Sequence, residues 1–555
     1  MSKSATLPSA SSGVSSSDSW WLYPGIITLA GLLLFFFRLG VPGLMDPDEG
    51  RYAEIGREML LLKDWLIPHL NLLPYLEKPP LVYWLTSLSF ASFGLTEWAA
   101  RLPSALAALA GLYLAYGLGR ALWGERQGFW GAMVLATCGG YVILGRLLTL
   151  DMVFTFFLNL GIALGYLALS RERPHLWLWA YLSLALAVLV KGPVALVLTG
   201  LIWGTVAFLK GRQAASALIR PAAWALSAAV VLPWFVYLAW RIPGFLRFFL
   251  WENHVTRYVS GVSFHAEPWW YFGPVLLGLL LPWTGLAPWA LARWTSMDAG
   301  DRLFLMIWGG VTLAFFSLSR GKLATYILPA LLPLALLLGE GLARLQVRDR
   351  GLRKASGCTV SLSIWAVIGW LLLAFSVWPP AILAPLLHQA LFLEPYLLIC
   401  LLLLALIPTV ALIVRHVEVL LVGALLFGTL LPLGMERLAL QRSPKALGLT
   451  LKDHWQPGAA LVGIYLYSQG LSFYSGEIFH LLEFRTELDF GHRLVPASGL
   501  FLRHREELQT FAASKPLLFF YLKSKNVSWL TTWLAREYDI LAQQNDCLLI
   551  QSHRK

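Results

Sequence analysis

The sequence predicts an α-helical multi-span integral membrane protein with a small α/β domain at its C-terminal end. Three observations indicate this fold class. Hydrophobic residues make up 58% of the 555 residues and the mean hydropathy is +0.65, more apolar surface than a soluble domain can bury. Apolar runs long enough to cross a bilayer recur along the chain. Near the C-terminus they give way to shorter strand-like and helix-like segments.

The apolar runs predict about thirteen transmembrane helices, because a spanning helix needs roughly 20 mainly apolar residues. These runs cover residues 21–38, 101–122, 129–145, 151–169, 176–190, 193–209, 222–240, 270–292, 303–318, 324–343, 358–379, 395–414 and 417–435.

The loop charges predict how these helices are oriented. With the N-terminus in the cytoplasm, the short cytoplasmic loops carry fifteen Lys and Arg residues and the short opposite loops carry seven. Cytoplasmic loops of membrane proteins are enriched in these residues, so the asymmetry favours this orientation. The net charge of +12 follows in part from the same bias, and we expect no nucleic-acid partner.

Two long segments then face the outer side of the membrane, the first loop at 40–100 and the tail from 436 onward. Within the first loop, "PLVYWLTSLSFASF" is apolar but too short to span comfortably, so we expect a helix at the outer interface. If this segment crossed the bilayer, every later loop would change sides and the cation asymmetry would invert.

The tail has the pattern of a folded domain outside the membrane. The stretches "AALVGIYLYSQGLSFY", "KPLLFFYLK" and "CLLIQ" predict buried strands, and "SWLTTWLAREYDI" predicts an amphipathic helix. We therefore expect a disordered, Ser-rich cytoplasmic tail at 1–20, a membrane domain at 21–435 and an outward α/β domain at 436–555.

The first outward loop contains a dense group of charges. Only 13% of all residues are charged, yet "LMDPDEGRYAEIGREM" places Asp48, Arg51 and Glu54 three positions apart, where a helix would bring them near one face. Further along, "YLEKPPLVYW" places Glu77 and Lys78 before two prolines, which are tolerated at the start of a helix. We expect this pair at the mouth of the interfacial segment.

Three later outward stretches add ionisable groups. "GRLLTLDMVF" holds Arg146 and Asp151, and Asp151 enters an apolar run. An ionisable group inside a membrane segment costs roughly 2.5–3.5 kcal/mol on insertion scales and usually marks a site. "WENHVTRYVSG" and "SLSRGKLATYILP" supply the others: Glu252, His254, Arg257, Arg320, Lys322 and Tyr326. The alternative is a merely solvated rim, with Asp48 paired to Arg51 and Asp151 paired to Arg146.

This mixture of charges indicates the chemistry of a ligand. Lys and Arg at a lipid–water interface suit a phosphate, and a phosphate on a long lipid would reach the site sideways from the bilayer. Carboxylates would repel that phosphate, and they suit a sugar's hydroxyls or amine, or general-base work on an acceptor. The combination predicts transfer of a group from a lipid phosphate.

Four stretches, "DPDEGRYAEIGREM", "YLEKPPLVYWL", "GRLLTLDMVFTFF" and "GKLATYILP", resemble the lipid A aminoarabinose transferases. This family lies within the C-type glycosyltransferases, which also include the protein O-mannosyltransferases. The resemblance runs through most of the chain, including "SQGLSFYSG" and "TELDFG" in the tail. The Asp-Glu pair after the first span is shared across the wider group, whereas "EKPPL" and the C-terminal domain narrow it towards the aminoarabinose branch.

The resemblance implies transfer of 4-amino-4-deoxy-L-arabinose from undecaprenyl phosphate to a phosphate of lipid A, with inversion, at the periplasmic face of the bacterial inner membrane. It implies Asp48 and Asp151 as catalytic carboxylates. The substrate-binding residues that it implies are Arg51, Glu77, Lys78, His254, Arg257, Lys322 and Tyr326. Of these, Lys78, Arg257 and Tyr326 would hold the phosphate of undecaprenyl phosphate.

No complete set of metal ligands is evident. Asn253 stands where family members often carry an acid, which puts a metal site beside His254 in doubt and leaves Glu77 as a candidate ligand for a divalent metal. No cofactor is therefore certain. Membrane lipids are the remaining expected partners, and we expect a monomer. The cysteines are scattered and predict neither a disulfide framework nor a metal site: Cys138, Cys358, Cys400 and Cys547.

Two other functions fit part of this pattern. One is the same chemistry with a protein hydroxyl or another glycan as acceptor, in which case Asp48 would have to remove a proton. A phosphate acceptor needs no such base, because its second pKa is about 6 and it is largely ionised at neutral pH. The other is a transporter of lipid-linked sugar, which should show an internal repeat and charges deep in several spans. The sequence shows neither, which favours an enzyme.

Overall fold

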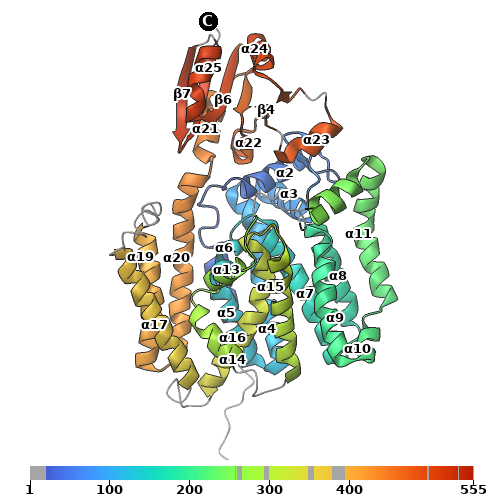
Figure 1. Ribbon diagram of the computed structural model, residues 1–555, viewed down its shortest axis with the longest axis vertical. Coiled ribbons are helices and arrows are strands. Elements are labelled where there is room, and N and C mark those ends of the chain that lie inside the picture. The colour runs from blue at the N-terminus through green and yellow to red at the C-terminus, as the bar shows by residue number, and fades with distance from the viewer. Residues whose placement is uncertain are drawn as a thin grey trace, which may run out of the picture.

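The computed structural model describes residues 21–256, 258, 266–292, 299–347, 356–377, 394–484, 486–496, 499–534 and 537–553. Long helices stand side by side in a bundle, and a small sheet domain sits on one end of it, here called the sheet-bearing end (Figure 1). The tail predicted at 1–20 lies outside the described residues.

Each of the thirteen predicted apolar runs contains helix in the described part of the chain. Eight helical segments are long and apolar enough to cross a membrane, or ten if each of two bent pairs is one span. The eight are α4 (Glu97–Trp123), α7 (Leu150–Ser170), α11 (Pro221–Arg241), α15 (Ala299–Leu318), η5 with α16 (Ala324–Ala330 and Leu331–Val347), α17 (Ser356–Val377), α19 (Glu394–Val414) and α20 (Glu418–Arg442). The multi-span helical fold is confirmed.

The other predicted runs are bent or short. The bent pairs are α5 (Glu125–Thr137) with α6 (Gly139–Gly145), at 68°, and α13 (Phe272–Leu279) with η3 (Thr284–Leu286) and α14 (Ala287–Ala292), at 112°. The shorter helices are α1 with η1 (Leu22–Gly31 and Leu32–Phe36), α8 (Leu176–Lys191) and α9 (Val194–Lys210). The predicted thirteen therefore include three helices shorter than the roughly 20 residues of a typical span. Helix α10 (Arg212–Ala217) and the π-helical segment η2 (Arg247–Thr256) link longer elements.

The first outward loop folds against the sheet-bearing end of the bundle. It contains α2 (Asp48–Leu62), the two-stranded hairpin β1–β2 (His69–Leu70 and Leu73–Pro74) and α3 (Leu81–Phe93). Acids in the first turn of α2, Asp48 and Glu49, complement the partial positive charge of the helix N-terminus. Helix α3 begins directly after the two prolines and, at 13 residues, is shorter than the helices of spanning length. It lies next to α2 beneath the sheet domain (Figure 1).

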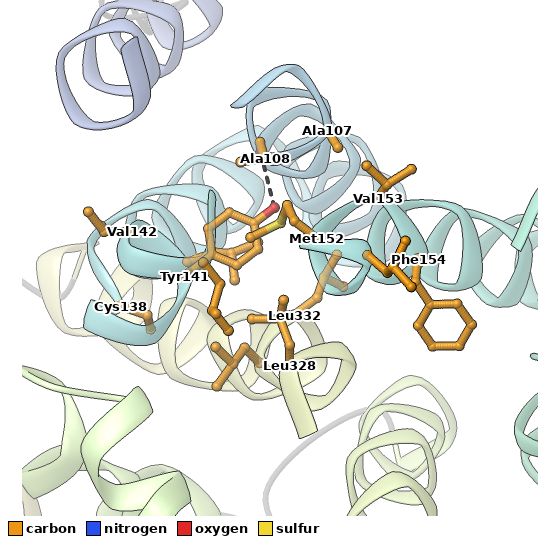
Figure 2. Close-up of a cluster of buried hydrophobic side chains, with 14 of the residues drawn as sticks. Ala107, Ala108, Cys138, Tyr141, Val142, Met152, Val153, Phe154, Leu328 and Leu332 are labelled. Carbon is orange, nitrogen blue, oxygen red and sulfur yellow. Dashed lines mark hydrogen bonds between the residues drawn. The ribbon is translucent and has the colours of Figure 1, made fainter. Parts of the chain in front are cut away.

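A buried core below this loop holds α7 in place. Figure 2 shows side chains from α4, α6, α7, η5 and α16 in contact around the start of α7, with Met152 and Leu328 fully buried. The Tyr141 hydroxyl donates a hydrogen bond of 3.0 Å to the carbonyl of Ala108, which satisfies a polar group inside this core. A Cβ at Gly111 would lie 2.0 Å from that hydroxyl, so this position of α4 needs glycine. The core fixes the first turn of α7, where Asp151 lies.

The sheet domain follows α20 and contains a six-stranded mixed sheet of order β5-β4-β3-β6-β8-β7. Strands β5, β4, β3 and β6 are parallel, and β8 runs antiparallel to both β6 and β7. The strands are β3 (Ala460–Ile464), β4 (Phe479–Leu482), β5 (Phe501–Leu502), β6 (Leu517–Lys523), β7 (Glu537–Gln544) and β8 (Cys547–His553). The helices are α21 (Lys445–His454), α22 (Gln469–Ser475), η8 (Thr486–Leu488), α23 (Asp489–Leu494), α24 (Arg505–Ser514), η9 (Ser524–Asn526) and α25 (Val527–Trp533).

The predicted strands in "KPLLFFYLK" and "CLLIQ" are present as β6 and β8. Two predictions were wrong in part. In "AALVGIYLYSQGLSFY" the strand ends at Ile464 and α22 follows, because the Ser468 side chain accepts a hydrogen bond from the amide of Leu471 and caps a new helix. The helix predicted in "SWLTTWLAREYDI" ends at Trp533, and β7 begins at Glu537 because β8 pairs with that segment. The boundary predicted at 435/436 falls inside α20.

Candidate active site

The candidate site begins at the N-terminus of α2. The Asp48 carboxylate lies 3.5 Å from Nη1 of Arg51 and is 55% exposed. Nη2 of the same guanidinium binds Oε2 of Glu487 in the sheet domain at 2.7 Å, and both of these side chains are about five-sixths buried. Arg51 therefore joins the predicted catalytic acid to a residue from the far end of the chain. The predicted Arg51–Glu54 neighbourhood is not an ion pair, since Glu54 binds Arg57 at 2.7 Å through both carboxylate oxygens.

Glu49, directly after Asp48, has a different environment. Its carboxylate is buried and forms a bidentate pair with Arg101 of α4 at 2.7 and 2.8 Å. It also accepts a hydrogen bond of 2.9 Å from the amide of Leu148, in the turn before α7. Glu49 thus ties the start of α2 to both α4 and α7. The Asp-Glu pair of the motif divides into an exposed acid and a buried anchor.

Asp46 attaches the same turn to the sheet domain. Its Oδ2 accepts a hydrogen bond of 2.5 Å from the Ser468 hydroxyl, and its Oδ1 accepts one of 2.9 Å from the amide of Gly470. Burial raises the pKa of Asp46 to about 6, against the lowering effect of these hydrogen bonds. A Cβ on Gly50 would lie 2.0 Å from Oδ1 of Asp46, so glycine at this position leaves room for the Asp46 carboxylate. The sheet domain is thus in direct contact with the loop that carries Asp48.

A second ion pair lies at the start of α7. Asp151 is paired with Lys191, which ends α8, and both side chains are mostly buried. Nζ of Lys191 lies 4.8 Å from the ring centre of Tyr326 and 5.3 Å from that of Phe154. His254 shares a hydrogen bond of 3.3 Å with the carbonyl of Lys191. Three predicted site residues, Asp151, Tyr326 and His254, therefore meet around a lysine.

Glu77 and Lys78 lie just before α3, as the two prolines predict. The Tyr75 hydroxyl donates a hydrogen bond of 3.2 Å to Glu77, and Nζ of Lys78 donates one of 3.3 Å to the carbonyl of Glu77. Both side chains are partly buried.

Electrostatic interactions link these groups into one cluster. The pKa of Glu487 is raised, mainly by burial and further by the negative charges of Glu77 and Asp48, while Arg51 opposes the rise. Loss of solvent also raises the pKa of Asp48; Arg51 opposes this, and Asp151 adds to it. Because Asp48 is still 55% exposed, solvent limits its rise. The two ion pairs and the Glu77 turn thus act on one another across the sheet-bearing end.

The remaining predicted residues have other surroundings. Nζ of Lys322 is buried and donates to the carbonyls of Ser319 and Glu267 at 2.5 and 2.8 Å. Burial lowers its pKa. Its phosphate-binding role stays a prediction. Arg257 lies outside the described residues. The alternative pairing of Asp151 with Arg146 was wrong, because Arg146 donates to two carbonyls of the first helical run.

The described part of the chain contains no group of three or more His, Cys, Asp or Glu side chains that could hold a metal ion. Nδ1 of His254 lies 2.6 Å from the carbonyl oxygen of Phe249, so this ring nitrogen already has a hydrogen-bond partner. Glu77 is thus a candidate metal ligand with no completed set around it in the described residues.

Sequence reasoning missed three residues of the cluster. Lys191 ends an apolar run on the outward side, and the argument applied to Asp151, an ionisable group at a membrane segment, would have found it. Glu487 lies within "TELDFG", a stretch quoted for the resemblance but not examined for chemistry. Asp46 lies two residues before Asp48, and nothing in its local sequence indicates a contact with Ser468.

Comparisons with known proteins find similar chains. The sequence family described as dolichyl-phosphate-mannose-protein mannosyltransferase matches residues 77–240. A relative from Pseudomonas fluorescens (strain Pf0-1), named undecaprenyl phosphate-alpha-4-amino-4-deoxy-L-arabinose arabinosyl transferase 2, is 37% identical over 341 residues, which cover 58% of this chain and 60% of the relative. A relative from Pseudomonas aeruginosa (strain UCBPP-PA14) is named undecaprenyl phosphate-alpha-4-amino-4-deoxy-L-arabinose arabinosyl transferase. It is 37% identical over 327 residues, which cover 58% of this chain and 59% of the relative. The match thus spans about 60% of the length of these curated relatives.

The similarity in three dimensions extends further. ArnT from Cupriavidus metallidurans bound to undecaprenyl phosphate has a TM-score of 0.84 and 24% sequence identity to this chain, covering 96% of this chain and 98% of that one. The apo state of the same protein has a TM-score of 0.83 and covers 97% and 98%. The resemblance found in the sequence motifs is therefore confirmed, and the chain has the C-type glycosyltransferase fold, like that of ArnT.

Proposed function

We propose that this protein is a polyprenyl-phosphate-sugar-dependent glycosyltransferase. It moves a sugar, 4-amino-4-deoxy-L-arabinose, from undecaprenyl phosphate to a phosphate of lipid A. The reaction takes place at the periplasmic face of the bacterial inner membrane, and the protein acts as a monomer. The first support is the names of the curated relatives, and the second is the solved structure of similar fold whose title includes undecaprenyl phosphate.

The observation that carries the proposal is the position of Asp48. It is an exposed carboxylate fixed at a helix N-terminus by its buried neighbour Glu49, beside the Arg51–Glu487 pair. The site lies at the end of a bundle of membrane-length helices, where a lipid-borne substrate can arrive from the bilayer.

The cations suit the donor phosphate. Lys78 lies just before α3, and its ammonium suits a phosphate oxygen. We assign Arg257 and the Tyr326 hydroxyl to the same phosphate, as the family resemblance implies. Lys191, beside Tyr326, adds positive charge to this side of the site, although Asp151 balances it.

The acids suit the sugar. Glu77 and Glu487 add negative charge near Asp48. Burial is the main cause of the raised pKa of Glu487, and repulsion from Glu77 adds to it, while Arg51 opposes the rise. An amino sugar carries an ammonium group at neutral pH, which would relieve this repulsion. The balance of acids and bases therefore fits an aminated sugar on a lipid phosphate better than a neutral one.

In the reaction, an oxygen of the acceptor phosphate attacks the anomeric carbon of the sugar from the face opposite the donor. The bond from that carbon to the donor phosphate breaks, and undecaprenyl phosphate leaves with the electron pair, so the configuration inverts. The acceptor phosphate is largely ionised at neutral pH and needs no general base. Asp48 stabilises the positive charge that develops on the sugar ring and steers the acceptor.

The test is mass spectrometry of lipid A from cells that lack the protein and are supplied with wild type, Asp48→Asn or Asp453→Asn. Asp453 is an exposed acid of α21 with no ionic partner in the described residues, so its variant is a matched control. We expect the added sugar with wild type and Asp453→Asn and none with Asp48→Asn. Identical lipid A in all of these cells would refute the proposal.

One observation favours a second acceptor class. The sequence family that matches residues 77–240 is described as a protein mannosyltransferase family. A protein hydroxyl acceptor would require Asp48 to take a proton. A change confined to glycoproteins in the same cells would establish that alternative.

A further inference from the structure

A cavity lies away from the candidate active site, between the end of α20 and the sheet domain. Its volume is about 530 Å³, within the range of roughly 300–1,000 Å³ of small-molecule pockets. Four parts of the chain line it: the loop at 41–43 after the first helical run, Tyr396 in α19, the last turns of α20 with α21, and the tip of the β7–β8 hairpin at Gln544.

The hairpin wall is held firmly. Nε2 of Gln544 donates to the carbonyls of Leu440, Gln441 and Ser443 at 3.1, 3.3 and 2.8 Å. Nδ2 of Asn545 donates to the carbonyl of Gln441 at 2.8 Å. The last carbonyls of a helix have no partner within the helix, so these amides complete the end of α20. The tip of the hairpin and the end of α20 are thus held together at one edge of the cavity.

The lining contains both apolar and charged side chains. Val41, Leu440 and Leu449 line it and remain exposed, with Leu440 at 70%. Because α20 is a helix of membrane-spanning length, its end at Arg442 marks the boundary between hydrocarbon and headgroups. Exposed apolar side chains at this level lie against lipid.

Most of the charges around the cavity are already neutralised. Glu436 binds Arg38 through both carboxylate oxygens at 2.6 and 2.7 Å. Lys445 binds Glu97 at 2.6 Å. Arg437 also lines the cavity, is exposed, and has no ionic partner among the described residues. The cavity therefore offers one uncompensated positive charge beside an apolar surface.

We propose that this cavity binds the headgroup of an anionic glycerophospholipid. Arg437 binds the phosphodiester, with the paired oxygens that a guanidinium recognises. Val41, Leu440 and Leu449 contact the first carbons of the acyl chains. One unpaired cation matches the single charge of a phosphodiester, whereas a saccharolipid with two phosphates would leave a charge unmatched.

Such a lipid would touch three parts of the chain at once: the first loop, α20 and the β7–β8 hairpin. It would therefore stabilise the attachment of the sheet domain to the bundle. This role is independent of the donor and acceptor lipids of the proposed reaction.

The experiment uses the full chain in nanodiscs that contain equal amounts of phosphatidylglycerol and phosphatidylcholine. After extraction into mild detergent, native mass spectrometry counts the lipids that each protein retains. The variants are Arg437→Gln, which removes the charge, and Ala446→Trp, which fills the cavity from a lining residue without altering a charge. The control is Arg241→Gln, because Arg241 ends α11, is exposed, and has no ionic partner in the described part of the chain.

We expect wild type and Arg241→Gln to retain one phosphatidylglycerol in preference to phosphatidylcholine. Both cavity variants should reduce this retention by about tenfold. Arg437→Gln removes one charge-assisted contact of about 1.4 kcal/mol, and Ala446→Trp fills the space that the headgroup needs. Equal retention by Arg437→Gln and Arg241→Gln would overturn the proposal, as would equal retention of the two lipids by wild type. Retention only of an added bis-phosphorylated saccharolipid would overturn it in favour of an acceptor site. None of these measurements depends on sugar transfer, so the outcome is separate from that of the proposed function.

Discussion

Arg51 and Glu487 form an ion pair of 2.7 Å that joins α2, near the start of the chain, to η8 in the sheet domain. The carboxylate of Glu487 also accepts a hydrogen bond from Nε2 of the Gln469 side chain, so it is held from within its own domain. The sheet domain is therefore part of the candidate site, because it sets the position of the guanidinium that faces Asp48.

The first prediction concerns this ion pair. Glu487→Gln should lower the rate of sugar transfer by about 10- to 100-fold, because a hydrogen bond to a charged group contributes about 1.5–3 kcal/mol. The measurement is the rate of transfer by purified protein with a saturating donor. Glu483→Gln, an exposed acid just after β4, is the matched control and should keep the wild-type rate. Equal rates in both variants would show that Glu487 is only a surface contact.

The second prediction separates the two acids of the motif. Glu49→Gln leaves the buried Arg101 without its partner and should destabilise the protein by about 3–5 kcal/mol. Asp48→Asn removes an exposed charge and should change stability by about 0.5 kcal/mol or less, while it abolishes transfer. Thermal unfolding and transfer measured on the same samples test both halves. A stable Glu49→Gln protein would contradict the anchoring role.

The third prediction concerns Asp151 and Lys191. Each single change, Asp151→Asn or Lys191→Gln, leaves a mostly buried charge uncompensated and should reduce both stability and transfer. The double variant should be more stable than the sum of the two effects predicts, with a coupling energy of about 0.5–3 kcal/mol. A double-mutant cycle by thermal unfolding provides this number. Strict additivity would mean that the pair does not act as a unit.

The fourth prediction is a pH dependence at Asp46. Its folded pKa of about 6 lies above the usual value of 3.8, so the folded protein binds this proton more tightly than the unfolded chain does. Stability from this group is therefore greatest below about pH 4, falls as pH rises to about 6, and is constant above about 7, with a total of at most about 3 kcal/mol.

Asp46→Asn removes this titration but keeps an oxygen that can accept from the amide of Gly470. Melting temperatures of both proteins should therefore diverge in favour of the variant between about pH 4 and pH 6 and then run parallel. Parallel curves across the whole range would show that Asp46 has an ordinary pKa.

The fifth prediction concerns the opposite end of the bundle. Glu340 of α16 is fully buried between Arg302 and Arg344. Glu340→Gln should lower stability by about 3–5 kcal/mol, because it removes the buried negative charge that both arginines bind. Transfer per folded molecule should not change, since these residues belong to no part of the candidate site. A lowered rate in fully folded protein would reveal long-range coupling between the two ends.

The sequence was sufficient to predict the helices of the bundle and about half of the residues at the candidate site. Long apolar runs report directly on burial in lipid, so each of the thirteen runs was found again as helix. Asp151 could be singled out because an ionisable group is costly inside such a run, and Asp48 and Arg51 because charges are dense in the loop after the first run.

The partners of these residues could not be predicted in the same way. The pairing of Asp151 with Lys191 rather than Arg146 depends on how α7 packs against α8, which no local pattern encodes. The contacts of Asp46 with Ser468 and of Arg51 with Glu487 join residues more than 400 positions apart. In the sheet domain, short apolar segments fit a strand or a helix equally well. A local cap at Ser468 starts a helix in one of them, and pairing with β8 makes a strand from Glu537 in the other.

The side-chain amides of Gln544 and Asn545 bind the last carbonyls of α20, which lie 101 to 104 positions earlier in the chain. During synthesis, the end of α20 therefore stays without these partners until the β7–β8 hairpin has been made. Since Asp46 also contacts the sheet domain, the loop that carries Asp48 reaches its final position only after that domain has folded.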